Sequence, residues 1–487
     1  MEICPHFGLC GGCTYQDMSY EEQLALKYGK VCSLLAEYAQ DDVWEAPVES
    51  PRRYGYRNKM EFSFGDCEKG GPLTLGLHQK KSFYNVITVN GCNIVDDDFR
   101  RILSATLDFF SERGVTYYHK RRQDGVLRHL VIRKAARTGE ILVLLAATSG
   151  ADRDMLAEWV ESLQKLEYDG TIAGILYARN DLPADTVQSQ ETVVLFGRDH
   201  FYEEILGLRF RISPFSFFQT NSLGAEKLYE TVREYCGDVS GLRIFDLYSG
   251  TGTIAQMLAA VASEVTGVEI VEEAVDAARE NAKLNSLSNC SFIAGDVFKV
   301  LSEAGASMGL PDMMVLDPPR EGMTPKALER ILSYEVPRLV YVSCKPESLA
   351  RDMETFAAHG YRIERARCVD MFPWTRHVET VVLLSKGNIS SEKIRVEFNL
   401  EDMDMSKFQQ GATYEQIQDW VQEKYGFHVT HLNIAKTKRK CGIIERQNYN
   451  LPKREDSRSP ETPKEKEEAI IEAFKVFQMI QALDKQD

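Results

Sequence analysis

A cysteine follows a predicted strand late in the chain, where Val342-Ser343 leads into Cys344-Lys345-Pro346. A thiol at the end of such a strand, beside a cation and a predicted helix start, indicates a nucleophile with a lowered pKa. The last predicted strand then begins near His377 and Glu379, which supply an imidazole and a carboxylate at the same edge. Either group could accept a proton, so these residues indicate covalent catalysis assisted by a general base.

An acid and two rigid prolines follow an earlier predicted strand, in the segment Asp317-Pro318-Pro319-Arg320. The carboxyl ends of parallel strands are where doubly wound sheets bind ligands and perform chemistry. A loop of this type at that position is typical of methyltransferases that act on nucleobases. Dinucleotide-dependent dehydrogenases have no use for it.

A glycine-rich loop, Asp246–Gly252, joins another predicted strand to a helix. Glycines let the backbone approach a ligand closely. Gly250, Gly252 and Ala255 also satisfy the G-x-G-x-x-A pattern, so a nicotinamide-dependent oxidoreductase is an alternative. The next two strands end at Glu269, where a ribose hydroxyl would lie in either protein class, and at Asp296, where an adenine would lie.

Three of the 11 cysteines are concentrated at the start of the chain, as Cys4, Cys10 and Cys13. Closely spaced thiolates among glycines suit a metal ion or an iron–sulfur cluster, and the spacing leaves zinc and iron–sulfur both open. A fourth ligand must come from further along. Cys32 lies on a predicted amphipathic helix, where a core role is expected, whereas Cys67 and Cys92 lie in turn-like segments.

The elements that must position these residues alternate regularly between residues 211 and 386. A predicted helix, Leu223–Tyr235, precedes short apolar runs separated by helical segments, which predicts an α/β domain with a parallel, doubly wound, Rossmann-like sheet. The predicted strands are Arg243–Tyr248, Val265–Glu269, Ser291–Ala294, Met313–Leu316, Leu339–Ser343 and Val378–Ser385.

Three other segments flank this domain. Residues 1–50 hold the cysteine segment and a helix over Tyr20–Tyr38. Residues 51–210 are predicted to form an α+β middle region. Its predicted strands are Met60–Phe64, Leu127–Arg133, Ile141–Ala147, Val193–Phe196 and Leu208–Ile212, with helices near 96–113 and 151–167. Residues 390–487 are predicted to form a small α+β C-terminal module, with a helix over Tyr414–Tyr425 and a strand over Val429–Ile434.

The net charge of −15 argues against non-specific binding of nucleic acid by the chain as a whole. Three basic runs interrupt this acidity. Arg52–Lys59 interleaves cations with tyrosines that could stack on bases, while Lys120–Arg137 and Lys436–Arg454 each carry seven cations against one acid. A basic run is often only a solvated face, but three in so acidic a chain favour contact with nucleic acid.

Together these residues resemble the RNA uridine-5 methyltransferase family over roughly residues 1–386. The matching positions, in the family's order and spacing, are Gln219 in Phe217–Asn221, the Asp246–Gly252 loop, Glu269, Asp317–Arg320, Ser343-Cys344 and His377–Glu379. The cysteine-rich start resembles the subgroup that carries a [4Fe-4S] cluster and methylates 23S ribosomal RNA. In that subgroup the fourth ligand falls on Gly91-Cys92-Asn93, so the resemblance implies Cys4, Cys10, Cys13 and Cys92 as ligands.

The resemblance implies a class I methyltransferase domain that uses S-adenosylmethionine. Gln219, Tyr248, Glu269 and Asp317 would contact this cofactor, with Asp317 also close to the uracil and Asp296 near the adenine. Carbon 5 of uracil is a poor nucleophile until a thiolate, here Cys344, adds to carbon 6. Glu379 would then remove the carbon 5 proton, with His377 as the alternative base.

Two features depart from the subgroup. The first cysteine comes three residues after the start, so we expect no β-barrel RNA-binding domain before it, and the C-terminal module exceeds the family's core. The alternatives are the same chemistry on transfer RNA and a non-catalytic RNA-binding factor of ribosome assembly. The longest apolar run, Ile141–Ala147, is far shorter than the roughly 20 residues of a membrane span. With no secretory leader expected, we predict a cytoplasmic monomer that contacts no membrane.

Overall fold

The computed structural model describes residues 3–387, apart from 185, 186, 188 and 304, together with residues 414–441 and 463–476. Two compact units, Met1–Ser390 and Ser391–Asp487, make up the chain. None of the helices in these described ranges has the length and apolar character needed to cross a membrane.

The first unit begins with the cysteine loop and α1 (Tyr20–Leu34), followed by the short 3-10 helix η1 (Asp41–Val43). The helix starts at Ser19, whose hydroxyl accepts from the Glu22 N–H while the Glu22 carboxylate accepts from the Ser19 N–H. It ends four residues before the predicted Tyr38, because Leu35 caps it and a turn follows. Beyond η1, Trp44 and Val48 form β-bridges to a strand near the end of the unit. The N-terminal segment therefore contacts residues that lie far from it in the sequence.

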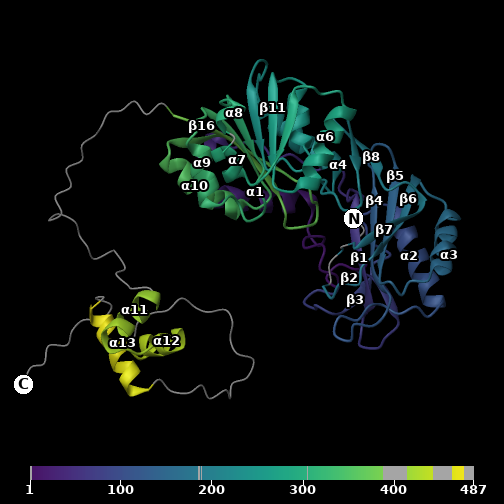
Figure 1. Ribbon diagram of the computed structural model, residues 1–487, viewed down its shortest axis with the longest axis horizontal. Coiled ribbons are helices and arrows are strands. Elements are labelled where there is room, and N and C mark those ends of the chain that lie inside the picture. Colours follow the sequence, from purple (N-terminus) through teal and green to yellow (C-terminus); the bar gives the residue numbers. More distant parts are fainter. Residues whose placement is uncertain are drawn as a thin grey trace, which may run out of the picture. The chain divides into compact units, whose positions relative to one another are not determined.

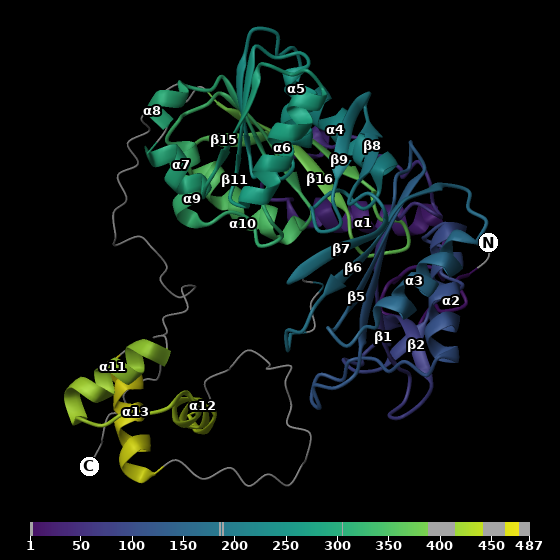
Figure 2. The ribbon, with the colours of Figure 1, turned by 45° about the vertical axis from the view of Figure 1, so that its right-hand side comes forward.

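A seven-stranded sheet forms the middle region, with strand order β3-β2-β1-β4-β5-β6-β7. Its strands are β1 (Lys59–Asp66), β2 (Leu73–His78), β3 (Val86–Thr88), β4 (Leu127–Lys134), β5 (Glu140–Ala147), β6 (Thr171–Arg179) and β7 (Glu191–Gly197). All neighbours are antiparallel except β5 and β6. Two helices, α2 (Asp97–Glu112) and α3 (Arg153–Gln164), cover one face (Figures 1 and 2). The sequence did not predict β2, β3 and β6; glycines interrupt β2 and β6 at Gly76 and Gly174.

The other face of this sheet joins the rest of the unit through a shared hydrophobic core. The hairpin of β8 (Phe201–Ile205) and β9 (Leu208–Ile212) lies here with α4 (Ser222–Cys236). Val131 and Leu144 of the middle sheet belong to the same buried cluster as Phe210 and Leu228. The middle sheet and the elements that follow it therefore share one continuous hydrophobic core.

A second seven-stranded sheet has the order β12-β11-β10-β13-β14-β16-β15. Its strands are β10 (Arg243–Leu247), β11 (Glu264–Glu269), β12 (Cys290–Ala294), β13 (Met313–Leu316), β14 (Arg338–Ser343), β15 (Tyr361–Val369) and β16 (Glu379–Lys386). Strands β10–β14 are parallel, which confirms the predicted doubly wound α/β architecture. The unpredicted β15 pairs antiparallel with β16, and β16 runs antiparallel to β14, so this end of the sheet is mixed.

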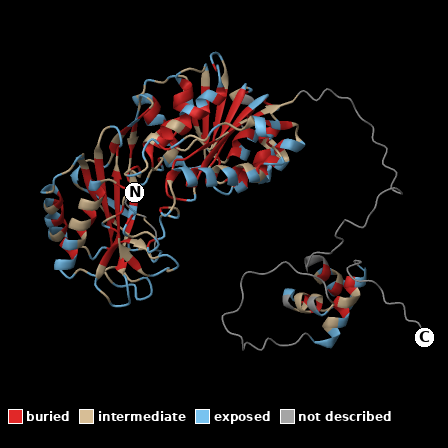
Figure 3. Ribbon diagram, turned by 180° about the vertical axis from the view of Figure 1, so that it is seen from behind, coloured by how far each residue is buried: buried red, intermediate tan, exposed pale blue. Residues whose placement is uncertain are grey.

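Helices cover both faces of the second sheet (Figure 1). They are α5 (Thr253–Ala259), α6 (Glu272–Leu284), α7 (Val297–Glu303), α8 (Gly305–Met308), α9 (Pro325–Leu332) and α10 (Pro346–Ala358). Buried residues concentrate on the strands and on the inward faces of the helices (Figure 3). One core lies under α4, α5 and α6, and a second lies under α7, α9 and α10 together with α1.

The described part of the second unit contains α11 (Tyr414–Tyr425), α12 (His431–Lys440) and α13 (Lys464–Val476). They enclose a small core that includes Ile417, Val421, Ile434, Ile470 and Phe474. The predicted helix is confirmed, but the predicted strand Val429–Ile434, and with it the α+β character expected of these residues, is wrong. The Thr430 hydroxyl accepts from the Asn433 N–H at the start of α12, and this local bond favours helix over extended chain.

Candidate active site

Cys344 and Glu379 lie side by side because β14 and β16 are antiparallel neighbours. Ser343 at the end of β14 pairs with Thr380 in β16. Cys344, the residue after β14, therefore comes next to Glu379, the residue that begins β16, and the charge of Glu379 acts on its thiol. Cys344 is half-buried, whereas the Glu379 carboxylate is only 6% exposed. Strand register thus brings together a thiol and a carboxylate that are far apart in the sequence.

Burial raises the pKa of the Cys344 thiol to about 11, and the charges of Glu379 and Asp317 add to this effect. The predicted lowering of this pKa is wrong. The cation expected to lower it, Lys345, reaches instead toward Glu321, at an Nζ–Oε2 distance of 3.9 Å. Arg320 and a backbone hydrogen bond lower the pKa but do not offset these effects. These surroundings favour the protonated thiol at neutral pH.

The carboxylates of this cleft also resist ionisation. Burial, followed by the charge of Asp317, raises the pKa of Glu379 to about 8, while Arg320 acts in the opposite direction. Burial raises the pKa of Asp317 to about 7. Two acids and a thiol in one poorly hydrated place disfavour each other's negative charge. Such an arrangement fits a cationic ligand.

Arg320 and His377 form a polar contact at the mouth of this site. The Arg320 Nη2 donates to His377 Nδ1 at 3.2 Å. Burial lowers the pKa of His377, and the neighbouring guanidinium groups of Arg320 and Arg376 lower it further. The imidazole is therefore neutral and its Nδ1 acts as an acceptor. It orients the arginine that faces Cys344 and Glu379.

A cleft lies in front of Cys344, between the N-terminal segment and the segments that carry Arg320 and His377. Its walls are formed by Tyr15, Leu26, Lys27, Lys30, Arg320, Cys344, Lys345, Pro346, Glu347, Arg376, His377 and Val378. Thr14 and Tyr15 donate their N–H groups to the Trp374 carbonyl at 2.7 and 2.9 Å. The segment after the cysteine loop is thereby fastened to the wall that carries His377.

The glycine-rich loop lies at the carboxyl edge of the same sheet. Tyr248, Gly250 and Gly252 have φ values of 67°, 54° and 75°, a left-handed conformation that favours glycine. The Glu269 carboxylate accepts from the Gly250 N–H at 3.0 Å. A Cβ built on Gly250 would meet nothing within 4 Å, so the space over the loop is open to a ligand.

The other residues predicted to bind a cofactor surround this loop. The Tyr248 hydroxyl interacts electrostatically with Asp296, whose carboxylate also accepts from the Lys299 N–H at 3.1 Å. Gln219 hydrogen-bonds the buried Tyr229 hydroxyl, which lies close enough to Asp317 to interact with its charge. Gln219, Tyr248, Glu269, Asp296 and Asp317 therefore line one continuous edge, formed by the ends of β10–β13 and the segment before α4.

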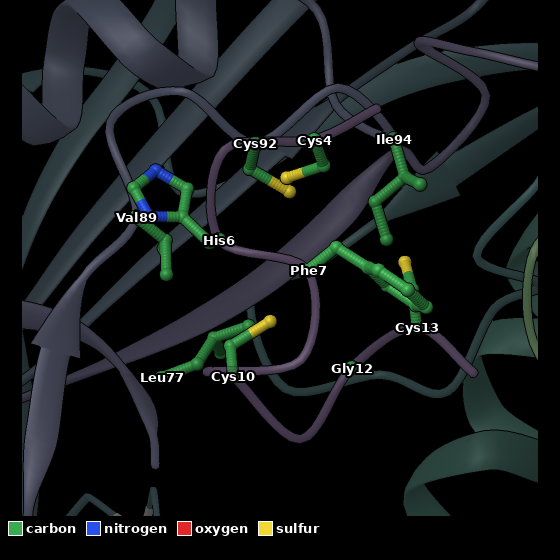
Figure 4. Close-up of a pocket in the computed structure, with 10 residues that line it drawn as sticks. All are labelled: Cys4, His6, Phe7, Cys10, Gly12, Cys13, Leu77, Val89, Cys92 and Ile94. Atoms are coloured by element: carbon green, nitrogen blue, oxygen red, sulfur yellow. The ribbon is translucent and has the colours of Figure 1, made fainter. Parts of the chain in front are cut away.

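Cys4, Cys10, Cys13 and Cys92 line one pocket, together with the apolar side chains of Phe7, Leu77, Val89 and Ile94 (Figure 4). Their thiols point into it from the N-terminal loop and from the segment after β3. The Gln16 Nε2 donates to the Cys13 Sγ at 3.3 Å. Of the two alternatives for the fourth position, Cys67 is exposed and Cys32 lies beside Tyr28 on α1. Neither lines this pocket.

Burial raises the pKa of Cys13 to about 12 and that of Cys92 to about 11, and the cysteines raise one another's pKa further. Thiolates in this apolar pocket would therefore need a compensating positive charge. Across the described residues, no three His, Cys, Asp or Glu side chains converge closely enough to hold one metal ion.

Comparison with known proteins identifies the family. Residues 182–387 match the family described as tRNA (uracil-5-)-methyltransferase. An uncharacterized RNA methyltransferase of Clostridium tetani is 49% identical over 384 residues, which are 79% of this chain and 83% of that protein. One of Bacteroides thetaiotaomicron is 36% identical over 399 residues, or 78% and 87% of the two chains. The chain belongs to the RNA (uracil-5-)-methyltransferase family.

A solved structure agrees with this assignment. The crystal structure of Pyrococcus abyssi tRNA (uracil-54, C5)-methyltransferase in complex with S-adenosyl-L-homocysteine has a TM-score of 0.63 and 28% identity, and the match covers 77% of this chain and 86% of that one. As a member of the family, this enzyme methylates carbon 5 of uracil in RNA and uses S-adenosylmethionine as the methyl donor.

Sequence reasoning missed two contributors to the site of this methyltransferase. Arg320 ends the motif that begins at Asp317, but the sequence does not indicate that its charge acts on both Cys344 and Glu379. Lys27 and Asp370 form a buried ion pair at 2.7 Å that fixes the loop before His377. Nothing in the sequence indicates this second pair, because 343 positions separate the partners.

The structure also changes the interpretation of two basic runs. Within Lys120–Arg137, Arg128 and Arg133 are buried and donate to backbone carbonyls, so the run is not one continuous basic surface. Within Arg52–Lys59, Tyr56 is buried and Tyr54 stacks on Trp374 at 5.1 Å. Both tyrosines contact the loop before His377, but only Tyr56 is buried, whereas Tyr54 is 38% exposed.

Proposed function

We propose that this enzyme methylates carbon 5 of a specific uridine in 23S ribosomal RNA through a covalent adduct on Cys344. The observation that carries the proposal is the register of β14 and β16, which sets a thiol beside a buried carboxylate. Two chemically different groups at one point are what the reaction requires, because one must add to the base and the other must remove a proton.

The step at Cys344 supplies electrons to carbon 5. Cys344 gives its thiol proton to solvent, its sulfur forms a bond to carbon 6 of uracil, and the carbon 5–carbon 6 π electrons move into the ring as an enolate with charge available at carbon 5. When bound, S-adenosylmethionine supplies an electrophilic methyl group and a positive charge. Carbon 5 then carries both the new methyl group and its original proton.

Glu379 completes the turnover in this proposal. Its carboxylate takes the proton from carbon 5, the electron pair re-forms the double bond, and the bond between carbon 6 and the Cys344 sulfur breaks. The cysteine leaves as a thiolate and the enzyme is free. His377 is the weaker candidate for this base, because its Nδ1 accepts from Arg320.

The raised pKa values of Cys344, Glu379 and Asp317 are consistent with this mechanism. A cationic ligand beside Asp317 would favour the charged form of each group. We assign Gln219, Tyr248, Glu269, Asp296 and Asp317 to the cofactor. The open space over Gly250 and the carboxylate of Glu269 beneath it support this assignment.

We further propose that Cys4, Cys10, Cys13 and Cys92 hold a [4Fe-4S] cluster. The convergence of four thiols in an apolar pocket supports it, as does the N–H···S contact from Gln16. The four sulfurs of a cluster stand further apart than the ligands of one zinc ion. Zinc, which four cysteines can also hold, is the alternative that metal analysis decides.

Iron analysis of anaerobically purified protein tests the cluster. We expect about four irons per chain and a brown colour. Cys92→Ser should lose iron, whereas the matched control Cys67→Ser, at an exposed cysteine, should retain it. Stoichiometric zinc without iron, or full iron in Cys92→Ser, would contradict the assignment.

Transfer RNA is the second candidate substrate, since the Pyrococcus abyssi relative is named a tRNA methyltransferase. Transfer of a labelled methyl group to purified 23S ribosomal RNA and to transfer RNA, followed by mapping of the modified nucleotide, decides between them. We expect 5-methyluridine at a defined position of 23S ribosomal RNA. Methylation of transfer RNA alone would overturn this target.

A further inference from the structure

Phe83 and Tyr84 project into solvent from the turn between β2 and β3. Phe83 is 86% exposed and Tyr84 is 64% exposed, and Phe83 is the most exposed aromatic side chain in the described residues. Exposed aromatic rings gain nothing from folding, and neighbouring ones indicate a binding surface more often than single ones do. Neither residue belongs to the motifs that carry the methyl-transfer chemistry.

The turn that presents these rings is tightly built. The Gln79 N–H donates to the Asn85 carbonyl at 2.9 Å, and the Asn85 side chain donates to the Gln79 side chain at 3.1 Å. The Ser82 hydroxyl accepts from the N–H groups of Tyr84 and Asn85. Lys80 donates its N–H to the Leu9 carbonyl at 2.7 Å, which fastens the turn to the cysteine loop. The rings are therefore exposed on a braced support.

One cation, Arg121, contacts the Tyr84 ring, and the two turns that meet here carry four more. The Arg121 guanidinium lies 5.4 Å from the centre of the Tyr84 ring, and its Nη2 donates to the Tyr84 hydroxyl at 3.2 Å. The exposed cations of this turn and of the neighbouring turn are Lys80, Lys81, Lys120, Arg121 and Arg122. The residues of the two turns, 79–85 and 117–125, include one acid, Asp124, which pairs with Arg122. This concentration of positive charge lies in a chain with a net charge of −15.

We propose that this surface, the aromatic tip formed by Phe83, Tyr84 and the five cations of the two turns, binds unpaired bases of the RNA substrate. Aromatic rings stack on the faces of unpaired bases, and the adjacent cations neutralise the phosphates. Stacking tolerates any base, so the tip holds the strand and does not read its sequence. The inference rests on the proposed function only in taking RNA as the ligand.

The aromatic tip is also connected to the active-site cleft. It bonds to the cysteine loop through Lys80 and Leu9, and Gly11 donates its N–H to the His78 carbonyl at 3.2 Å. A few residues later, Thr14 and Tyr15 bond to Trp374 in the cleft wall. An RNA strand bound at the tip would thus be held by the same brace that supports the wall beside Cys344.

Binding of a short, unstructured RNA oligonucleotide to the whole protein tests the proposal without methyl transfer. Phe83→Ala and Tyr84→Ala should each weaken binding about tenfold, because each removes one stacking platform. Leu310→Ala is the matched control, since Leu310 is 74% exposed in the other half of the unit, and it should leave affinity unchanged. Phe83→Trp should retain affinity, and its indole emission should be quenched when RNA is added.

Kinetics separate this inference from the proposed function. At saturating RNA the kcat of Phe83→Ala should equal that of the wild type, while KM rises, because no group that reacts has changed. A double alanine variant that binds the oligonucleotide within twofold of the wild type, or an unquenched Phe83→Trp, would overturn the proposal and favour a protein partner. If the wild type binds RNA through the tip but methylates none, the proposed function fails and the tip stands.

Discussion

At the scale of single residues, the site combines groups that ordinarily repel one another when charged. Glu379, Asp317 and Cys344 lie close enough for their charges to interact, and burial raises the pKa of each group. The sequence predicted which residues meet, because each ends or begins a predicted strand. It gave the wrong direction for the Cys344 pKa, because Lys345 is adjacent in sequence while Glu379 arrives only through strand pairing.

The raised pKa of Glu379 predicts how stability depends on pH. In the unfolded chain this group loses its proton near its ordinary pKa of 4.5, but in the folded protein it does so only near pH 8. Between these values the folded state holds the extra proton, so this group lowers stability as pH rises. The Tm of Glu379→Gln minus that of the wild type should therefore increase as pH rises from about 5 to about 8. A difference in Tm that does not change with pH would contradict the assigned burial of charge.

At the scale of elements, several hydrogen bonds and a buried ion pair hold the loop between β15 and β16 in place. Lys27 on α1 donates to the Asp370 carboxylate at 2.7 Å and to the Phe372 carbonyl at 3.0 Å. The Tyr56 hydroxyl donates to the Pro373 carbonyl at 3.0 Å, and the Trp374 N–H of the loop donates to the Gln23 side-chain oxygen at 2.7 Å. This support fixes the loop that leads into His377 and Glu379.

The buried Lys27–Asp370 pair predicts a large effect on folding. Lys27→Met would remove the cation that pairs with the buried Asp370 carboxylate, and breaking a buried ion pair in this way costs about 3–5 kcal/mol. Urea unfolding should show this loss, and the double variant Lys27→Met/Asp370→Asn should recover part of it. A single variant with wild-type stability would show that the pair does not fasten α1 to the loop.

Elements with a strong apolar period were predictable, and elements defined by distant partners were not. The parallel strands β10–β14 follow directly from alternating apolar runs, as does α4. Strand β15 was not predicted, because Glu364 and several arginines interrupt its apolar pattern. The arginines find their partners, Glu45 and Glu234, only in the fold. The segment Val429–Ile434 has strand-like composition, but Thr430 caps a helix there.

At the scale of the whole molecule, the second unit has a core of its own and contributes none of the predicted catalytic or cofactor residues. Its described basic residues include Lys436, Lys438 and Lys440 on α12, and Lys440 pairs with Glu467 of α13. The remainder of the predicted basic segment, residues 442–454, lies outside the described residues. We propose that this unit adds phosphate contacts to RNA binding without reading bases.

Removal of the second unit tests that proposal. A chain that ends at Lys386 should bind S-adenosylmethionine as before, because every residue assigned to the cofactor precedes that point. Its RNA affinity should fall, and the slope of log affinity against log salt should decrease by about 0.7–0.9 for each lost phosphate contact. An unchanged slope together with unchanged affinity would assign the unit to another partner.

The covalent role of Cys344 is the central claim, and trapping of the adduct tests it most directly. Glu379→Gln, mixed with S-adenosylmethionine and the RNA substrate, should accumulate a methylated RNA–protein adduct that survives denaturing electrophoresis. The adduct persists because nothing removes the carbon 5 proton. Cys344→Ala should form no adduct and no product. Turnover by Cys344→Ala, or an adduct that forms without Cys344, would contradict the mechanism.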